Sequence, residues 1–186
     1  MATNPHVIPV PTILNVVSNL RLGCALDAQE VAERLCNAMK KNDAAYYHDF
    51  FTEMTILRLS ESEAAGTTAT CFDSGMLACT GAKTVDQSIA ATMMYARLIK
   101  SLDFPVNCQE EDIQIRSIVA SCDVKFHIRL DDFAELTGGS SIYNPRLYPP
   151  LIYRMTNPSV VLLISEGGKI ILIGARVIHF FLSPLN

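Results

Sequence analysis

The stretch NPSVVLLISEGGKIILIGAR, residues 157–176, contains two apolar runs, VVLLIS and KIILIGA, joined through Glu166, Gly167 and Gly168. Each run has the length of a β-strand, and the glycines between them indicate a tight turn. Side chains alternate between the two faces of a strand, so a hairpin with one face in water alternates apolar with polar residues. Both faces of this hairpin are apolar, which raises the question of what covers the second face.

The composition narrows the classes of protein to consider. The chain has 186 residues, of which 49% are hydrophobic and 18% are charged, and its net charge is −4. This length suits one domain, or two similar halves, with a substantial core. No apolar run approaches the roughly 18–20 residues that span a bilayer, and the start lacks the basic and apolar regions of a secretory signal. The six cysteines form no CxxC pair and no metal-like spacing with histidines, so we expect reduced thiols and no metal.

A pattern of strand, helix and further strands occurs twice along the chain. In the first half, NVVSNLRLG (15–23) predicts a strand, Asp27 begins a helix, and a second helix begins at Thr84 after more strands. SIVASCDV (117–124) and GGKIILIGAR (167–176) resemble the corresponding segments of that first half. Antiparallel strands with helices on one face predict an α+β protein. The other face then stays uncovered, and a large exposed apolar surface indicates a partner site.

Five segments carry a resemblance to a known family: NVVSNLRLGCALD, SGMLACTGAK, YARLIKSLDFP, SIVASCDVKFHIRLD and LYPPLIYRMTNPSVVLLIS. They lie in order over residues 10–176 and occur in both repeats. These segments are similar to the core of TATA-box-binding protein. We therefore identify the chain as a member of this family, either a divergent member or a related factor.

The resemblance implies a fold of two pseudo-twofold repeats that form a saddle-shaped, curved antiparallel sheet with helices on the convex face. We expect a Pro-rich leader at residues 1–11, a first repeat at 12–105 and a second repeat at 106–186. The C-terminal helix of the second repeat is expected to be short or missing, because RVIHFFLSPLN alone follows Ala175. The back of that repeat should then be partly bare near Ile164, Ile170 and Leu172.

The resemblance also implies a function. Members of this family are a known example of proteins that bind the DNA minor groove and insert aromatic wedges between base steps. We expect a nuclear general transcription factor that prefers A·T-rich, TATA-like DNA, bends it and nucleates initiation complexes with other general transcription factors. No enzymatic activity, cofactor, small-molecule substrate or membrane is expected.

The residues that meet the groove floor follow from the match to the family. An apolar strand face with a few Asn and Thr side chains suits A·T pairs, where no guanine amino group intrudes. The matching positions are Asn15, Val17, Ala78, Thr80, Ser117, Val119, Val161, Leu163, Ile171 and Ile173. The basic positions that approach phosphates in the family are Arg58, Lys83, Arg154, Lys169 and Arg176.

The aromatic wedges are expected to differ between the repeats. Phe72 matches one wedge of the first repeat, and its mate is Phe51 or, alternatively, Phe50. In the second repeat Tyr148 matches one wedge, and the neighbouring Pro149 matches a contact proline. Ser165 stands at the other wedge position and is too short to insert. We therefore expect a weaker kink under the second repeat.

The partner surface of the second repeat also departs from the family. In the loop YNPRLYP the family commonly has two glutamates, which transcription factor IIB uses, at the positions of Asn144 and Arg146. With the adjacent Leu147, these residues are the expected partner-binding site, and the reversed charge predicts altered recognition.

An alternative function is a divergent protein-interaction scaffold with weak or no DNA binding. Ser165 and the replacement of family lysines by Gly66, Met76 and Ser159 favour it. Each lost lysine removes counterion release and lowers the affinity for DNA. Retention of Phe72 and of the apolar underside favours DNA binding instead, because exposed apolar residues have little reason to persist without a partner.

Overall fold

The computed structural model describes residues 9–38, 44–49, 54–59 and 64–174, and the structural statements below concern these residues. The chain divides into two compact units. We call Asn15–Arg116 the first half, and Ser117–Asn186 together with Met1–Leu14 the second half.

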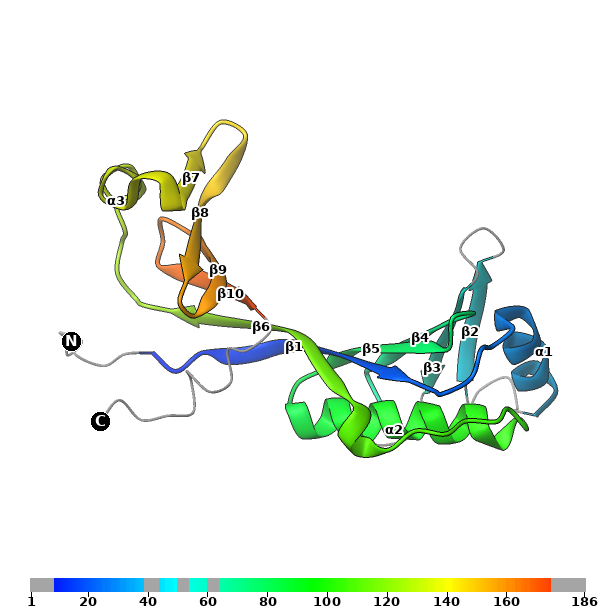
Figure 1. Ribbon diagram of the computed structural model, residues 1–186. Coiled ribbons are helices and arrows are strands. Elements are labelled where there is room, and N and C mark those ends of the chain that lie inside the picture. The colour runs from blue at the N-terminus through cyan, green and yellow to red at the C-terminus, as the bar shows by residue number, and fades with distance from the viewer. Residues whose placement is uncertain (1–8, 39–43, 50–53, 60–63, 175–186) are drawn as a thin grey trace. The chain divides into compact units, whose positions relative to one another are not determined.

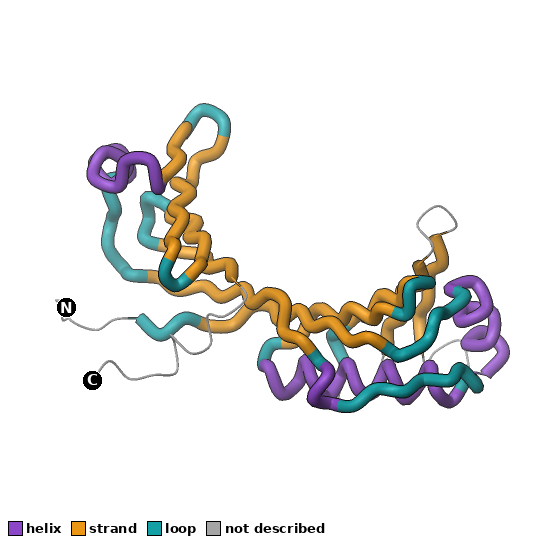
Figure 2. The backbone as a smooth tube through the Cα atoms, viewed as in Figure 1, coloured by secondary structure: helices purple, strands orange, loops and turns teal. Residues whose placement is uncertain are grey.

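The first half contains antiparallel strands in the order β2-β3-β4-β5-β1 (Figure 1). Figure 2 shows the long helix α2 running along one face of these strands. The elements are β1 (Thr12–Arg21), α1 (Ala28–Ala38), β2 (Ala44–Asp49), β3 (Met54–Leu59), β4 (Thr68–Phe72), β5 (Met76–Ala82), α2 (Val85–Ser101) and the 3-10 turn η1 (Glu110–Asp112).

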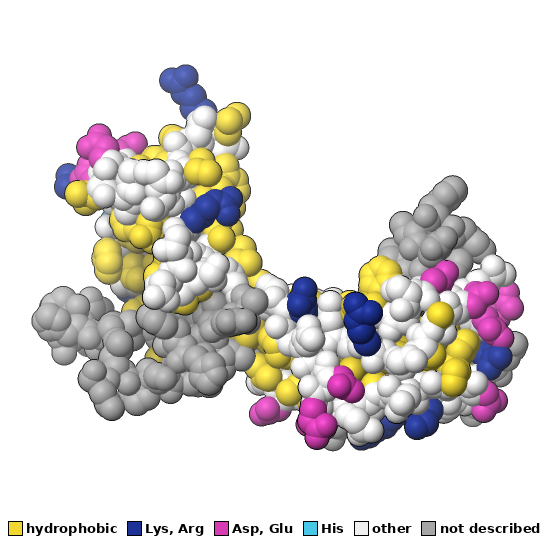
Figure 3. All heavy atoms as spheres, in the orientation of Figure 1, with side chains coloured by type: hydrophobic (Ala, Val, Ile, Leu, Met, Phe, Trp, Pro, Cys, Tyr) yellow, Lys and Arg dark blue, Asp and Glu magenta, His cyan; other side chains and the backbone are white. Residues whose placement is uncertain are grey.

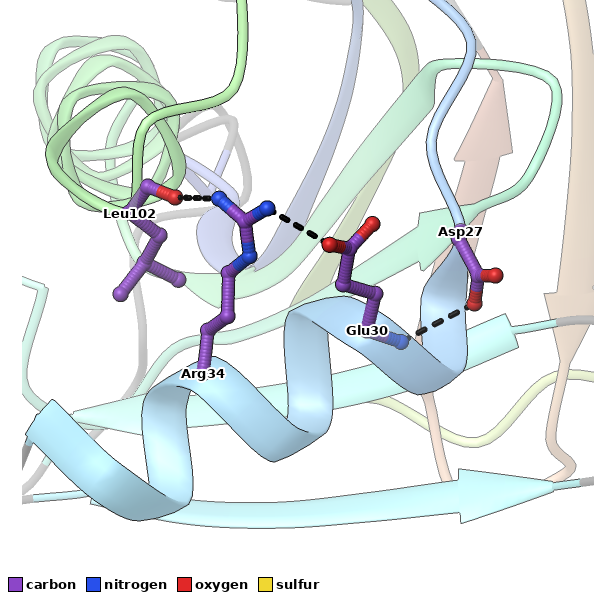
Figure 4. A network of polar contacts seen from close by, with 4 residues as sticks. All are labelled: Asp27, Glu30, Arg34 and Leu102. Atoms are coloured by element: carbon purple, nitrogen blue, oxygen red, sulfur yellow. Dashed lines mark hydrogen bonds and ion pairs between the residues drawn. The ribbon is translucent and has the colours of Figure 1, made fainter.

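Both helices of the first half begin at the predicted capping residues. The Asp27 carboxylate accepts a hydrogen bond from the Glu30 backbone N–H at 3.0 Å, and the Thr84 hydroxyl accepts one from Gln87 at 3.0 Å. These bonds satisfy backbone donors that have no partner within the first turn of a helix. Further along α1, Arg34 pairs with Glu30 at 2.6 Å and donates to the Leu102 carbonyl, which ties α1 to the end of α2 (Figure 4).

The core of the first half lies between its helices and its strands. A single cluster joins the buried side chains of β1, β3, β4, β5, α1 and α2, among them Leu20, Leu77, Tyr95 and Ile99. Buried hydroxyl groups run through the seam between α2 and the strands. Ser18 shares hydrogen bonds with Thr92 at 2.7 Å and Ser88 at 2.8 Å.

The second half contains antiparallel strands in the order β6-β10-β9-β8-β7 (Figure 1). Six of its buried residues gather in two small clusters, one of Ala120, Val160 and Leu172, the other of Leu130, Leu151 and Ile164. The elements are β6 (Gln114–Asp123), α3 (Leu130–Thr137), the 3-10 turn η2 (Gly138–Ser140), β7 (Ser141–Asn144), β8 (Tyr148–Thr156), β9 (Ser159–Ile164) and β10 (Lys169–Gly174).

The predicted hairpin of residues 157–176 is present as β9 and β10. Its turn closes through the Ser165 N–H to the Lys169 carbonyl at 2.9 Å and the Gly168 N–H to the Ser165 carbonyl at 3.0 Å. Gly168 has φ +91°, and a Cβ there would lie 2.5 Å from the Phe126 carbonyl oxygen. This turn therefore requires glycine at residue 168, both for its backbone conformation and for the close approach of the chain.

The predicted α+β class with antiparallel strands is confirmed. The structure differs from the sequence prediction at two points, and a further part of the prediction lies outside the described residues. The expectation of a bare back in the second half is wrong at Ile164, which is 3% exposed, because Leu130 of α3 packs beside it, and at Leu172, which is 8% exposed. The strand β7 was not predicted. The expected leader lies largely, and the expected C-terminal helix entirely, outside the described residues.

Candidate nucleic-acid interface

One face of the first half's strands carries no described helix. Along β1, Val16, Ser18 and Leu20 are buried toward α2, so Asn15 and Val17 point to the opposite face. Residues that pair across antiparallel strands share a face. The pairs Asn19↔Ala78, Thr70↔Ala78 and Thr68↔Thr80 therefore place β4 and β5 residues beside Asn15 and Val17. We call the residues Asn15, Val17, Asn19, Thr68, Thr70, Ala78 and Thr80 the first floor.

The Asn15 amide is held in place at the edge of the first floor. Its Oδ1 accepts a hydrogen bond from the Gly81 backbone N–H at 2.7 Å, and both Oδ1 and Nδ2 lie 3.2 Å from the Thr80 hydroxyl oxygen. Because Gly81 N–H needs an acceptor, Oδ1 and not Nδ2 faces it. The amide nitrogen and the Thr80 hydroxyl are thereby oriented together as a polar pair among the uncharged side chains of the first floor.

The second half has a matching but more apolar face. On β6, Ile118 and Ala120 are buried, and Ser117, Val119 and Ser121 alternate with them. On this face Ile173 pairs with both Val119 and Val161, and Ile171 pairs with both Ser121 and Leu163. We call the set Ser117, Val119, Ser121, Ile152, Val161, Leu163, Ile171 and Ile173 the second floor.

All ten predicted groove-floor residues therefore lie on the two floors. Five floor residues were missed by the sequence analysis. Extending the alternation of β1 by two positions from Val17 would have found Asn19, and the same step from Val119 would have found Ser121. The other three, Thr68, Thr70 and Ile152, are placed on the floors by the register in which the strands pair, and the sequence does not show that register.

The described wedge residues lie at strand ends next to the floors. Phe72 ends β4, two positions beyond Thr70 on the same face, and is half-buried. Tyr148 begins β8 and is 45% exposed, with the exposed Pro149 beside it. Ser165 follows β9 in the turn. Phe51 and its alternative Phe50 lie outside the described residues.

Basic side chains stand at the floors and at their ends. Arg58 on β3, Arg154 on β8 and Lys169 on β10 are exposed, as is Lys83 just after β5. Arg154 pairs with Val161, so it shares the face of the second floor. Arg176 lies outside the described residues.

The negative charge of the chain does not fall on the floors. Figure 3 shows acidic side chains gathered over α1, α2 and α3. Neither floor contains an Asp or Glu. On β6, the Asp123 carboxylate at the end of the strand pairs with Lys125 at 2.7 Å. Hydrogen bonds from Lys125 lower the pKa of Asp123, so this carboxylate stays ionised and paired. The net charge of −4 is therefore compatible with a polyanion at the floors.

The predicted partner residues lie together in the turn between β7 and β8. The Leu147 N–H donates to the Asn144 carbonyl at 3.0 Å and closes this turn. Asn144, Arg146 and Leu147 are all exposed, Leu147 to 83%. The hairpin therefore presents an apolar side chain beside a basic one, without a described helix over it.

Two kinds of site are not found in the part of the chain that the structure describes. No group of three or more His, Cys, Asp or Glu side chains is placed to hold a metal ion. Among the described helices, none has the length and apolar character needed to cross a membrane.

Both halves of the chain match a known protein family. The family model described as "Transcription factor TFIID (or TATA-binding protein, TBP)" matches residues 10–102 and 112–180, which confirms the predicted two-repeat organisation of the fold. TATA-box-binding protein 1 of Triticum aestivum is 42% identical over 177 residues, covering 95% of this chain and 70% of the relative.

Two further relatives agree with this match. TATA-box-binding protein 1 of Arabidopsis thaliana is 42% identical over 168 residues, covering 90% of this chain and 78% of the relative. The solved structure of Methanococcus jannaschii TBP matches with a TM-score of 0.67 and 32% identity, over 89% of this chain and 88% of that one.

Proposed function

The chain belongs to the family of transcription factor TFIID, or TATA-binding protein, and on that premise we propose that it binds the minor groove of A·T-rich DNA through its two floors. The family is one of non-enzymatic DNA-binding transcription factors, so the prediction that the chain is not an enzyme is confirmed. As a general transcription factor of this family it would act in the nucleus and seed initiation complexes.

The observation that carries the proposal is the Asn15–Thr80 pair among the uncharged side chains of the first floor, on a strand face without a described helix. The floor of the minor groove at A·T pairs presents acceptors, adenine N3 and thymine O2. The Asn15 amide nitrogen carries two N–H donors, and the Gly81 N–H fixes its orientation. The surrounding Val17 and Ala78 offer apolar contact that suits the sugar walls of a widened groove.

Wedges and basic residues supply the remaining parts of this proposal. Inserting Phe72 or Tyr148 into a base step costs a few kcal/mol of unstacking, which is recovered by the extra surface that bent DNA touches. Exposed Arg58, Arg154 and Lys169 would contact phosphates and release counterions. Because such basic residues are sparse, we expect a shallow dependence of affinity on salt.

Fluorescence anisotropy with labelled duplexes tests the proposal. We expect binding to a TATA-containing duplex to exceed binding to a G·C-rich duplex of equal length by at least about tenfold at each of two salt concentrations. Thr80→Val should weaken binding to the TATA duplex, whereas Ser101→Ala, at the exposed end of α2, should leave it unchanged.

Equal affinity for the two duplexes, or no binding to either, would contradict the proposal. The scaffold function would then gain support, because the exposed Leu147 and Arg146 at the β7–β8 turn offer a protein-binding surface that does not depend on DNA. In the proposed function the same turn, with Asn144, docks another general transcription factor.

A further inference from the structure

The two floors differ in the positions that meet the centre of the groove, and we propose that this makes the protein tolerate guanine under one half and reject it under the other. The first floor offers the guanine amino group a hydrogen-bonding partner in the Asn15–Thr80 pair. The second floor places Ile173 at the corresponding position of β10. This inference rests on the proposed function and specifies which part of the DNA site must be A·T.

The guanine amino group is the feature that the minor groove uses to distinguish base pairs. A·T and T·A present the same acceptors there, and G·C adds the N2 donor. Burying a donor that loses its water and finds no acceptor costs binding free energy. Burying a donor that gains a protein acceptor changes the binding free energy little. Discrimination against guanine therefore depends on whether the protein surface above the amino group can accept a hydrogen bond.

The first floor can do so. Thr80 is exposed, and its hydroxyl group carries one proton and two lone pairs. The Thr80 oxygen lies 3.2 Å from both Oδ1 and Nδ2 of Asn15, so Thr80 can donate to Oδ1 and turn its lone pairs outward. With acceptors opposite, the Asn15 amino group donates; with a guanine donor opposite, the Thr80 oxygen accepts. The pair therefore accommodates either kind of base pair.

The second floor cannot. Ile173 is 36% exposed and pairs with Val119 on one side and Val161 on the other. Ile171 lies two positions along the same face, with Leu163 beside it. None of these side chains contains an acceptor.

The serines of the second floor do not replace the missing acceptor. Ser117 and Ser121 carry their hydroxyl groups directly on Cβ, so these groups extend less far from the sheet than the isoleucine and leucine side chains of the same floor. Ser121 pairs directly with one of these longer residues, Ile171. A guanine amino group pressed onto this surface would lose its water without gaining a protein acceptor.

Two consequences follow for the DNA. Base pairs under the second half must be A·T, whereas a G·C pair under the first half is tolerated. A site with its guanine toward one end should therefore be bound in one orientation, with the first half over the G·C pair.

The experiment compares guanine with inosine, which is guanine without the N2 amino group. A single A·T pair of a TATA duplex is replaced in turn by G·C or by I·C at each position, and the two dissociation constants are measured. Their ratio isolates the amino group, because the remaining chemistry of the two pairs is the same. We expect a ratio near one in one half-site and a ratio on the order of tenfold or more in the other.

Variants assign the half-sites to the two halves of the protein. Ile173→Thr should lower the ratio in the strict half-site, and Thr80→Ile should raise it in the tolerant one. Ile170→Thr is the matched control, because Ile170 is the same residue type on the opposite face of the same strand and should leave both ratios unchanged.

Equal ratios in the two half-sites, or a ratio in the strict half-site that Ile173→Thr does not change, would overturn the inference. Those outcomes leave the proposed function intact if the unsubstituted A·T duplex still binds more tightly than a G·C-rich one. Failure to prefer the A·T duplex would overturn the proposed function and this inference together.

Discussion

The two halves repeat the same strand arrangement, yet their helix cover differs. The first half packs against α2, a helix of 17 residues, and most of its buried apolar residues join into one large cluster. Among the described residues of the second half, the α-helix is α3, with 8 residues, and buried side chains gather in two clusters of three, with Ile118 buried outside both. Both halves nevertheless present a floor over which no described helix lies. Strand register therefore sets the position of the floor, and we expect the helix cover to set the stability of each half.

The largest expected effect of this difference is on stability. Tyr95 is fully buried and donates to the Thr67 carbonyl at 3.0 Å, so Tyr95→Ala removes both a large ring and a buried hydrogen bond. We expect a loss of about 3–5 kcal/mol in the free energy of unfolding. Tyr153→Ala is the matched change in the second half, where the ring is half-buried and packs edge-on against Phe133. We expect it to cost about 1–2 kcal/mol.

Denaturant unfolding, followed by hydrogen exchange resolved by segment, measures both variants. Tyr95→Ala should lower protection throughout the first half, and Tyr153→Ala should lower it chiefly around α3 and β8. Similar losses for the two variants would show that the helix cover is not what separates the halves.

A smaller effect is expected from the buried hydroxyl groups. Ser18→Ala removes the side chain that bonds both Ser88 and Thr92, and leaves these two buried hydroxyls with fewer partners. The expected cost is about 1–3 kcal/mol. Ser121→Ala, the same change on the floor of the second half, should stay within about 0.5 kcal/mol. Thermal or urea unfolding of the two variants measures these costs. If Ser18→Ala left the free energy of unfolding unchanged, the buried hydroxyl groups between α2 and the strands would not stabilise the first half.

Cysteine reactivity should also differ between the two halves, because the cysteines are buried to different extents. Burial raises the pKa of the Cys71 thiol in the first half to about 12. Burial, with Asp123 nearby, also raises the pKa of Cys122 in the second half, but this thiol is half-exposed. Because the thiolate is the reactive form, we expect a thiol reagent to modify Cys71 at least about tenfold more slowly than Cys122.

Mass spectrometry of protein labelled over a pH series measures the two rates. Both rates should rise with pH, since each pKa lies above the ordinary value and deprotonation increases toward it. Faster labelling of Cys71 than of Cys122 would indicate that the first half opens more readily than its core implies.

Much of this arrangement is predictable from the sequence, for physical reasons that can be named. The alternation in β1, the caps at Asp27 and Thr84 and the glycines of the β9–β10 turn are local signals, and each was found. The floor residues Thr68, Thr70 and Ile152 depend on which strands pair, and in which register.

The remaining errors also have physical causes. The strand β7 has four residues, too few for alternation to identify it. The expected bare patch was wrong at Ile164 because the sequence does not show that Leu130 of α3 folds over it.

We expect both floors to bind DNA and the first half to do more to deform it. A duplex containing a TATA sequence, labelled at its two ends with a fluorescent donor and acceptor, reports the bend at saturating protein. We expect energy transfer to rise on binding, Phe72→Ala to abolish most of the rise, and Tyr148→Ala to reduce it less, because the tyrosine hydroxyl resists full apolar insertion. Equal losses from the two variants would contradict the inequality of the halves, and no rise with the unaltered protein would contradict DNA bending itself.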